Sequence, residues 1–124
     1  MNKIVIILRT DLNMRKGKMA AQASHAVQEV LLDRSGNMPC LRQDNPAMWE
    51  WLNNGKFTKI VVGIPSEEEL RNIYQTAINA ELPASLIQDS GKTEFAGVPT
   101  YTAVAIGPSD ADRIDAITGH LKLL

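Results

Sequence analysis

The chain has little cysteine, few aromatic residues and almost no net charge. Cys40 is the only cysteine, which excludes an internal disulfide framework and a zinc site built on several thiolates. This cysteine usage fits a reduced, intracellular setting, and we expect a cytoplasmic protein. The formal net charge is −1, so a nucleic acid would have to be bound by a local basic patch. Because no aromatic-rich stacking motif is present, such binding would rely on backbone and shape.

The chain also lacks the motifs of several enzyme classes. Gly-x-Ser-x-Gly, Gly-x-Gly-x-x-Gly and the phosphate-binding pattern Gly-x-x-x-x-Gly-Lys-Ser/Thr do not occur. The two histidines, His25 and His120, are not spaced as metal ligands, and no carboxylate cluster has that spacing. A metal enzyme is therefore not expected. Ser24 and His25 are neighbours, but adjacent helical side chains point about 100° apart and cannot form a nucleophile and base pair.

No hydrophobic run is long enough for a membrane. The apolar residues 4–8 are too few to cross a bilayer, and they continue into Arg9 and Asp11 without a small-residue cleavage site. We expect a buried strand there and no association with a membrane.

Apolar periodicity and turn residues predict one domain over residues 1–124. Strands are expected at residues 3–9, 57–64, 86–89 and 102–106. Helices are expected at residues 17–33, 46–54, 67–78 and 111–118, with a loop around residue 40 and with residues 107–110 closing the last strand. Helical crossovers favour parallel strand neighbours, whereas the short connection at residues 90–99 permits an antiparallel pair. The expected fold is a single α/β domain with a four-stranded mixed β-sheet covered by α-helices on both faces.

Two side-chain stripes run along the first expected helix. The apolar stripe comprises Ala20, Ala23, Val27, Val30 and Leu31, and its alanines would allow close approach to a sheet. The polar stripe comprises Lys18, Gln22, His25 and Glu29. In the second helix, Trp49 and Trp51 cannot both face the same way, so we expect one of them in the core.

The corner between the first strand and the first helix is basic. A helix start carries a partial positive charge, so Lys18 in the first turn is unfavourable unless an anion lies there. A bound phosphate, carboxylate or oxyanion would remove this conflict. The alternative is a solvated turn whose lysines point into water. The local basic patch would consist of Arg9, Arg15, Lys16 and Lys18.

A second candidate segment is Asp89-Ser90-Gly91-Lys92-Thr93, at the carboxyl end of an expected strand. Ligands in α/β sheets commonly bind at such ends. The alternative is a tight turn that binds nothing. Thr100 and Thr102 share one face of the last strand, and taken alone they are ordinary strand formers.

These segments resemble the signature of the type 2 peptidyl-tRNA hydrolases. In that family, Arg-Thr/Ser-Asp precedes Met-Gly-Lys-Gly-Lys-x-Ala-Ala-Gln, and here Arg9-Thr10-Asp11 precedes Met14-Arg15-Lys16-Gly17-Lys18-Met19-Ala20-Ala21-Gln22. Further markers follow in the family's order and cover essentially the whole chain: Trp51-Leu52, Lys59-Ile60-Val61, Asp89-x-Gly91-Lys92-Thr93, Thr102, Ala105-Ile106-Gly107-Pro108 and residues 117–123.

The resemblance implies hydrolysis of the ester that joins a peptide, or a blocked amino acid, to the terminal ribose of tRNA. It implies no cofactor and tRNA as the partner, with a homodimer left open. The residues that match the family's catalytic positions are Lys18, Asp89, Thr93 and Thr102. We expect substrate binding by Asp11, Arg15, Lys16, Gln22, His25, Lys92 and Thr100. Which group acts as the general base is left open.

Two departures from the family pattern stand out. Arg15 lies where the family more often has glycine, and residues 95–100 are one residue longer than the usual connection. The longer connection leaves the register of Thr100 against Thr102 open, although counting back from Gly107 favours Thr102. Two other functions are the alternatives: a catalytically silent domain that binds tRNA or a protein, and an enzyme acting on a smaller phosphorylated ligand.

Overall fold

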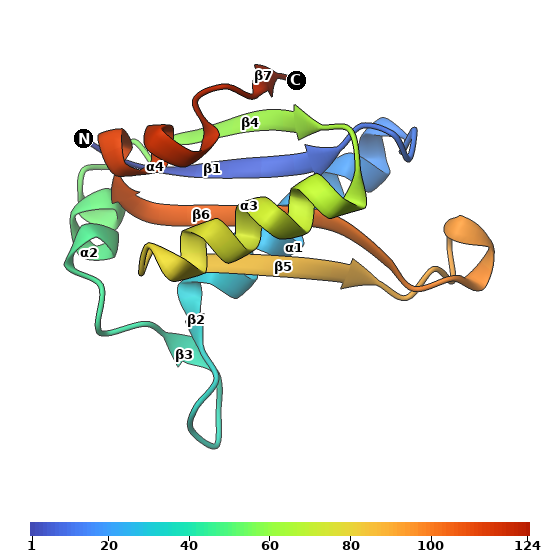
Figure 1. The fold of residues 1–124 in the computed structure, drawn as a ribbon. Coiled ribbons are helices and arrows are strands. Elements are labelled where there is room, and N and C mark those ends of the chain that lie inside the picture. The colour runs from blue at the N-terminus through green and yellow to red at the C-terminus, as the bar shows by residue number, and fades with distance from the viewer.

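The computed structural model describes all residues, 1–124. Its elements are, in chain order, β1 (Asn2–Arg9), α1 (Lys16–Leu31), β2 (Leu32–Asp33), β3 (Cys40–Leu41), α2 (Pro46–Asn53), β4 (Lys59–Ile64), α3 (Glu67–Asn79), β5 (Ala84–Asp89), the 3₁₀ turn η1 (Phe95–Gly97), β6 (Thr100–Asp110), α4 (Ala111–Thr118) and β7 (Lys122–Leu123) (Figure 1). The four predicted helices and the four predicted strands are all present.

The main sheet has the strand order β5-β6-β1-β4-β7. The β1–β4 pair, which is joined through helices, is parallel, and the other three pairs are antiparallel. The prediction of a mixed sheet is therefore confirmed, including the antiparallel pair across residues 90–99. The sheet has five strands and not four, because the two-residue strand β7 pairs with β4 at one edge. Cys40 was expected in a loop, but it pairs with Asp33 in a separate two-stranded ribbon of β2 and β3.

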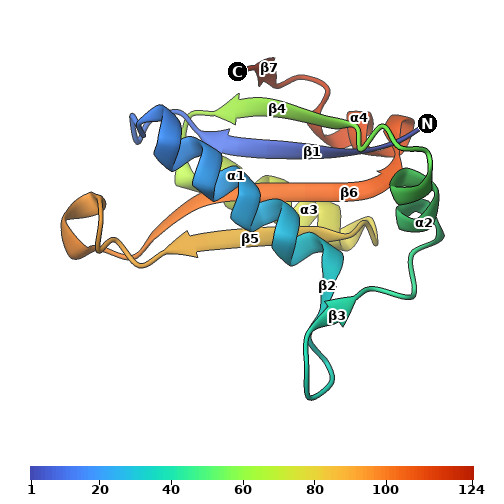
Figure 2. The same ribbon diagram turned by 180° about the vertical axis from the view of Figure 1, so that it is seen from behind.

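Helices cover both faces of the sheet, as predicted. Figure 1 shows α3 across one face, and Figure 2 shows α1 across the other. Alternation along β1 divides the core: Val5 and Ile7 pack on the α3 side, whereas Ile4, Ile6 and Leu8 pack on the α1 side. Trp51 of α2 is buried on the α1 side and Trp49 is 42% exposed, which confirms that one tryptophan belongs to the core.

The buried face of α1 matches the predicted apolar stripe in part, because Val30 lies in the core and Ala23, Val27 and Leu31 pack against it. The fully buried residues of the helix are Gln22, Ala26 and Val30, spaced four apart. Ala20 was expected in the apolar stripe but is exposed, and Gln22 was expected in the polar stripe but is 1% exposed. A buried amide is tolerated here because its oxygen accepts a hydrogen bond from the Thr102 hydroxyl.

Strand β6 continues through Gly107 and Pro108, which were expected to close it. Its antiparallel pairing with β1 extends as far as Asn2 and Asp110, and Asp110 then caps α4 by accepting from the backbone N–H of Asp112. Gly107 has a φ of 114°, and a Cβ there would lie 2.4 Å from the Lys3 carbonyl oxygen. The strand therefore passes this point only because the residue is glycine.

Candidate active site

Lys18 and Asp89 form the centre of the site. The Lys18 Nζ lies 2.8 Å from Asp89 Oδ1 and donates a second hydrogen bond of 3.0 Å to Thr93 Oγ1. Lys18 comes from the first turn of α1, Asp89 from the end of β5 and Thr93 from the loop that follows. The side chains of Lys18 and Asp89 are 12% and 15% exposed, so the ion pair is largely shielded but reachable from solvent.

The surroundings of Asp89 favour its ionised form. The hydrogen bond from Lys18 lowers the pKa of Asp89 below its ordinary value of 3.8, and partial burial opposes this effect. The Gly91 N–H, which donates to Asp89 Oδ2 over 2.9 Å, and the charges of Lys18 and His25 lower the pKa of Asp89 further. Asp89 is therefore a carboxylate at neutral pH, with both oxygens held by donors.

This carboxylate resolves the charge conflict at the start of α1. The cap residue Arg15 makes no side-chain hydrogen bond, and the first turn contains no acidic residue. The sequence left open whether a bound ligand supplies an anion beside Lys18 or the turn is solvated, and the protein itself supplies the anion from β5. The conflict is removed before any substrate binds.

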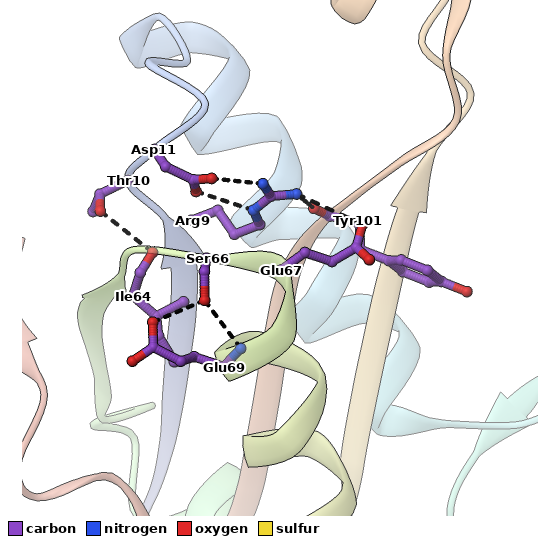
Figure 3. Close-up of polar contacts among 8 residues, drawn as sticks. All are labelled: Arg9, Thr10, Asp11, Ile64, Ser66, Glu67, Glu69 and Tyr101. Atoms are coloured by element: carbon purple, nitrogen blue, oxygen red, sulfur yellow. Dashed lines mark hydrogen bonds and ion pairs between the residues drawn. The ribbon is translucent and has the colours of Figure 1, made fainter.

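The basic patch is smaller than predicted. Arg9 is buried at the end of β1, where its guanidinium forms two hydrogen bonds with Asp11 (Figure 3). Lys18 is paired with Asp89. Arg15 and Lys16 are exposed and have no carboxylate within ion-pair distance. These two side chains are therefore the free cations of the strand-to-helix corner.

Phe95 is a neighbour of the site that the sequence did not indicate. Its ring centre lies 5.6 Å from the Lys18 Nζ, within range of a cation–π contact. Phe95 and Ala96 have positive φ angles of 65° and 51°, which are uncommon for residues with a side chain. Gly91 supports this loop, since a Cβ there would lie 2.3 Å from the Val98 carbonyl oxygen. No sequence pattern predicts a left-handed phenylalanine, so the contact could not be foreseen.

A β-bulge in β6 determines the position of Thr102. The β5–β6 register runs from Ile87 opposite Ala103 directly to Gln88 opposite Tyr101, which leaves Thr102 without a partner in β5. Thr102 is completely buried and donates to Gln22 Oε1 on α1, the helix against which Ala103 also packs. The bulge thus turns Thr102 toward α1 and sets Thr100 opposite Asp89.

The structure brings some predicted residues together and leaves others apart. Lys18, Asp89 and Thr93 contact one another, while Gln22 and Thr102 form a buried pair. Asp11 is bonded to Arg9, and Thr100 donates to the Val98 carbonyl oxygen. His25 and Lys92 are exposed and make no side-chain hydrogen bond. The predicted substrate-binding residues therefore do not form one connected hydrogen-bond network with the ion pair.

Two further observations describe the whole chain. No three His, Cys, Asp or Glu side chains are grouped so that they could hold a metal ion. Among the four helices, none combines the length and the apolar character that crossing a bilayer requires.

Comparisons with known proteins agree along the full length of the chain. The family model described as Peptidyl-tRNA hydrolase PTH2 matches residues 2–124. The peptidyl-tRNA hydrolase of Methanocaldococcus jannaschii is 48% identical over 98% of this chain and 99% of its own length. The peptidyl-tRNA hydrolase of Sulfurisphaera tokodaii is 44% identical, with 98% of each chain covered. The human mitochondrial peptidyl-tRNA hydrolase 2 is 40% identical, over 98% of this chain and 63% of its own length.

A solved structure supports the fold. A protein of unknown function from Agrobacterium tumefaciens strain C58 matches with a TM-score of 0.61, over 99% of this chain and 97% of that chain. The two sequences are 18% identical, so this likeness concerns the fold alone.

Proposed function

Since the chain belongs to the peptidyl-tRNA hydrolase PTH2 family and hydrolyses the ester bond of peptidyl-tRNA, we propose that Lys18, Asp89 and Thr93 carry out this reaction. The observation that supports the assignment is the direct contact of the three side chains in a shielded but reachable position. In the reaction, the oxygen of a water molecule attacks the ester carbonyl carbon, and the acyl–oxygen bond then breaks. One proton of the attacking water passes to the ribose oxygen as this bond breaks, so the products are the peptide with a free carboxyl group and tRNA with a free ribose hydroxyl.

Lys18 stabilises the oxyanion that forms on the ester carbonyl. An ammonium has three N–H donors, and Asp89 and Thr93 take up two of them. The third donor is free for the oxyanion. Because the two protein contacts fix the ammonium before the substrate arrives, little reorganisation is needed in the transition state.

Asp89 orients the attacking water and is a weak base for removing its proton. A general base is most effective when its pKa lies near the working pH, and the pKa of Asp89 is held below 3.8. A carboxylate has about four lone-pair sites, so Asp89 still accepts a hydrogen bond from water while it is bonded to Lys18 and Gly91.

The two threonines have different roles. Thr93 is exposed and accepts from Lys18, so its own O–H remains available for the water or the substrate. Thr102 is completely buried, and its hydroxyl is bonded to Gln22. We therefore assign Thr93 to the reacting groups, whereas Thr102 and Gln22 hold α1 against β6 one turn beyond Lys18.

The exposed cations bind the tRNA backbone. Arg15 and Lys16 lie at the start of α1, the helix that carries Lys18, and Lys92 lies in the loop after Asp89, so each residue of the ion pair has an exposed cation close to it in the chain. Without carboxylate partners, Arg15 and Lys16 are free to contact phosphates. His25 and Thr100 extend this surface along α1 and β6.

Two further parts of the proposal concern setting and assembly. We propose that the enzyme acts in the cytoplasm, because its substrate arises in translation and Cys40 is a free, exposed thiol.

We also propose a homodimer, for which the exposed Trp49 and Phe57 are contact candidates. Light scattering at several protein concentrations, with Trp49→Ala for comparison, tests the assembly.

The function is tested by release of an N-blocked amino acid from its tRNA ester. Wild-type protein should release it, and Lys18→Ala should lose most of this activity. A blocked ester without tRNA and a small phosphorylated ester are the comparison substrates. Binding of the tRNA ester without release would indicate a silent tRNA-binding domain, and preference for the small ester would indicate a different enzyme.

A further inference from the structure

Arg9 is a buried charge with partners on three sides. Its side chain is 10% exposed, so its transfer out of water must be offset by strong contacts. Nε and Nη2 donate to the two carboxylate oxygens of Asp11 over 3.0 and 2.7 Å, and Nη1 donates to the Tyr101 carbonyl oxygen over 3.0 Å. Figure 3 shows the guanidinium between these groups. Glu67 Oε1 lies 3.9 Å from Nη1.

The two hydrogen-bonded partners lie in segments that carry the proposed site. Asp11 belongs to the loop between β1 and α1, and this loop fixes where α1, with Lys18 and Gln22, begins. Tyr101 lies on β6 beside the bulged residue Thr102. A single guanidinium therefore ties the start of α1 to the β6 segment against which α1 packs.

The position of Arg9 in the sheet explains why a side chain is needed. Pairing between β1 and β6 ends at Leu8 and Ala103, so Tyr101 has no partner residue in β1. The Arg9 side chain replaces the missing backbone donor and donates a hydrogen bond to the Tyr101 carbonyl oxygen. Only arginine offers a planar fork for the carboxylate together with a further donor for the carbonyl, and lysine lacks this geometry.

We propose that Arg9 is a positioning residue for peptidyl-tRNA hydrolysis, which sets the distance between α1 and β6 through Asp11 and Tyr101 without contacting the substrate. The inference rests on the proposed function. On this proposal Asp11 holds Arg9 and does not bind the substrate, because both of its carboxylate oxygens accept hydrogen bonds from Arg9. The same contact lowers the pKa of Asp11, so the pair stays charged at neutral pH.

The test compares Arg9→Lys with Arg71→Lys. Arg71 is a matched control, because it shares two neighbours with Arg9: it lies 3.8 Å from Glu67 Oε2 and over the Tyr101 ring at 5.1 Å. Unlike Arg9, Arg71 does not donate to the Tyr101 carbonyl oxygen, and its side chain is 56% exposed. Arg9→Lys should lower kcat about 10-fold at unchanged KM, since small displacements of catalytic groups are costly. Arg71→Lys should keep wild-type kcat and KM.

Further measurements separate positioning from loss of structure or of binding. The kcat is expressed per folded molecule, with the folded fraction taken from circular dichroism. Asp11→Asn serves as a second variant should Arg9→Lys fail to fold, and it should show the same fall in kcat at unchanged KM, to a smaller extent. Wild-type kcat in the folded variants overturns the inference. A raised KM with unchanged kcat also overturns it, because Arg9 would then bind tRNA.

Lys18→Ala, measured in parallel, shows which proposal has failed. If Lys18→Ala loses activity while Arg9→Lys and Asp11→Asn do not, only the role of Arg9 is wrong. If Lys18→Ala keeps wild-type activity, the proposed site itself is wrong, and the inference about Arg9 is overturned with it.

Discussion

The Lys18 ammonium lies 2.8 Å from the Asp89 carboxylate, although the two residues are 71 positions apart in the sequence. The contact joins the first turn of α1 to the end of β5. Each residue compensates the charge of the other, so removing either one leaves a shielded charge without its partner. The pair is therefore expected to act as one unit in catalysis.

Lys18→Ala and Asp89→Ala should each lower kcat by about 10²-fold or more, the usual scale for losing a group that stabilises or orients the reacting atoms. The double variant should be little worse than either single variant, because the residues act together. The measurement is turnover of an N-blocked aminoacyl-tRNA at saturating substrate. Lys56→Ala is the control, since this exposed lysine precedes β4 at the opposite end of the sheet, and its kcat should be unchanged.

A chelator should leave this activity intact, because the Lys18–Asp89 pair supplies the charges that the reaction needs. Near wild-type kcat in both single variants would contradict the site assignment. Independent, multiplying losses in the double variant would contradict the view of the pair as a unit.

The lowered pKa of Asp89 predicts how stability depends on pH. A carboxyl whose pKa is lower in the folded state than in the unfolded state stabilises the fold above its unfolded pKa, here 3.8. This contribution is lost as the pH falls through the folded pKa. The Tm difference between wild type and Asp89→Asn should therefore be constant from about pH 5 to 7 and shrink below about pH 4. Thermal unfolding between pH 2 and 7 measures it, and a difference that persists at the lowest pH would contradict the prediction.

Local patterns in the sequence predicted the main elements but not the short or irregular ones. The apolar run of β1 and the capped start of α3 at Ser66 are signals within a few residues, and both elements formed where expected. The strand β7 has two residues, which is too short for an alternating pattern. The bulge at Thr102 depends on pairing with both β1 and β5, so it is not encoded in β6 alone.

In the candidate site, too, residues with a local motif were predicted correctly, whereas burial and contacts with distant residues were not. Lys18, Asp89 and Thr93 were identified from their motifs, and the structure brings them into contact. Arg9 was assigned to an exposed basic patch, because charge along a sequence does not reveal burial or a partner such as the Tyr101 carbonyl oxygen. Gln22 was assigned to a polar face for the same reason: its partner, Thr102, lies 80 positions away.

Arg15 and Lys16 should account for part of the salt dependence of tRNA binding. Each phosphate contact adds about one unit to the slope of log affinity against log salt concentration, so Arg15→Ala combined with Lys16→Ala should reduce the slope by about two units at most. Binding is measured between low and moderate salt with an uncleavable tRNA ligand. Lys56→Ala is the control, because this exposed lysine precedes β4 at the opposite end of the sheet. Unchanged affinity and slope in the double variant would place the tRNA surface elsewhere.

His25 should support substrate binding without acting as the general base. It lies seven positions after Lys18 on α1, which is about 10 Å along the helix axis at 1.5 Å per residue, so both side chains cannot hold one reacting group. His25 is exposed and makes no hydrogen bond, although its charge contributes to the lowered pKa of Asp89. His25→Ala should therefore raise KM or lower kcat modestly and leave the shape of the pH–rate profile unchanged. His120→Ala, which removes an exposed histidine after α4, should match wild type. Near-complete loss of turnover in His25→Ala, together with loss of an ionisation near the ordinary histidine pKa of about 6.5, would instead identify His25 as the base.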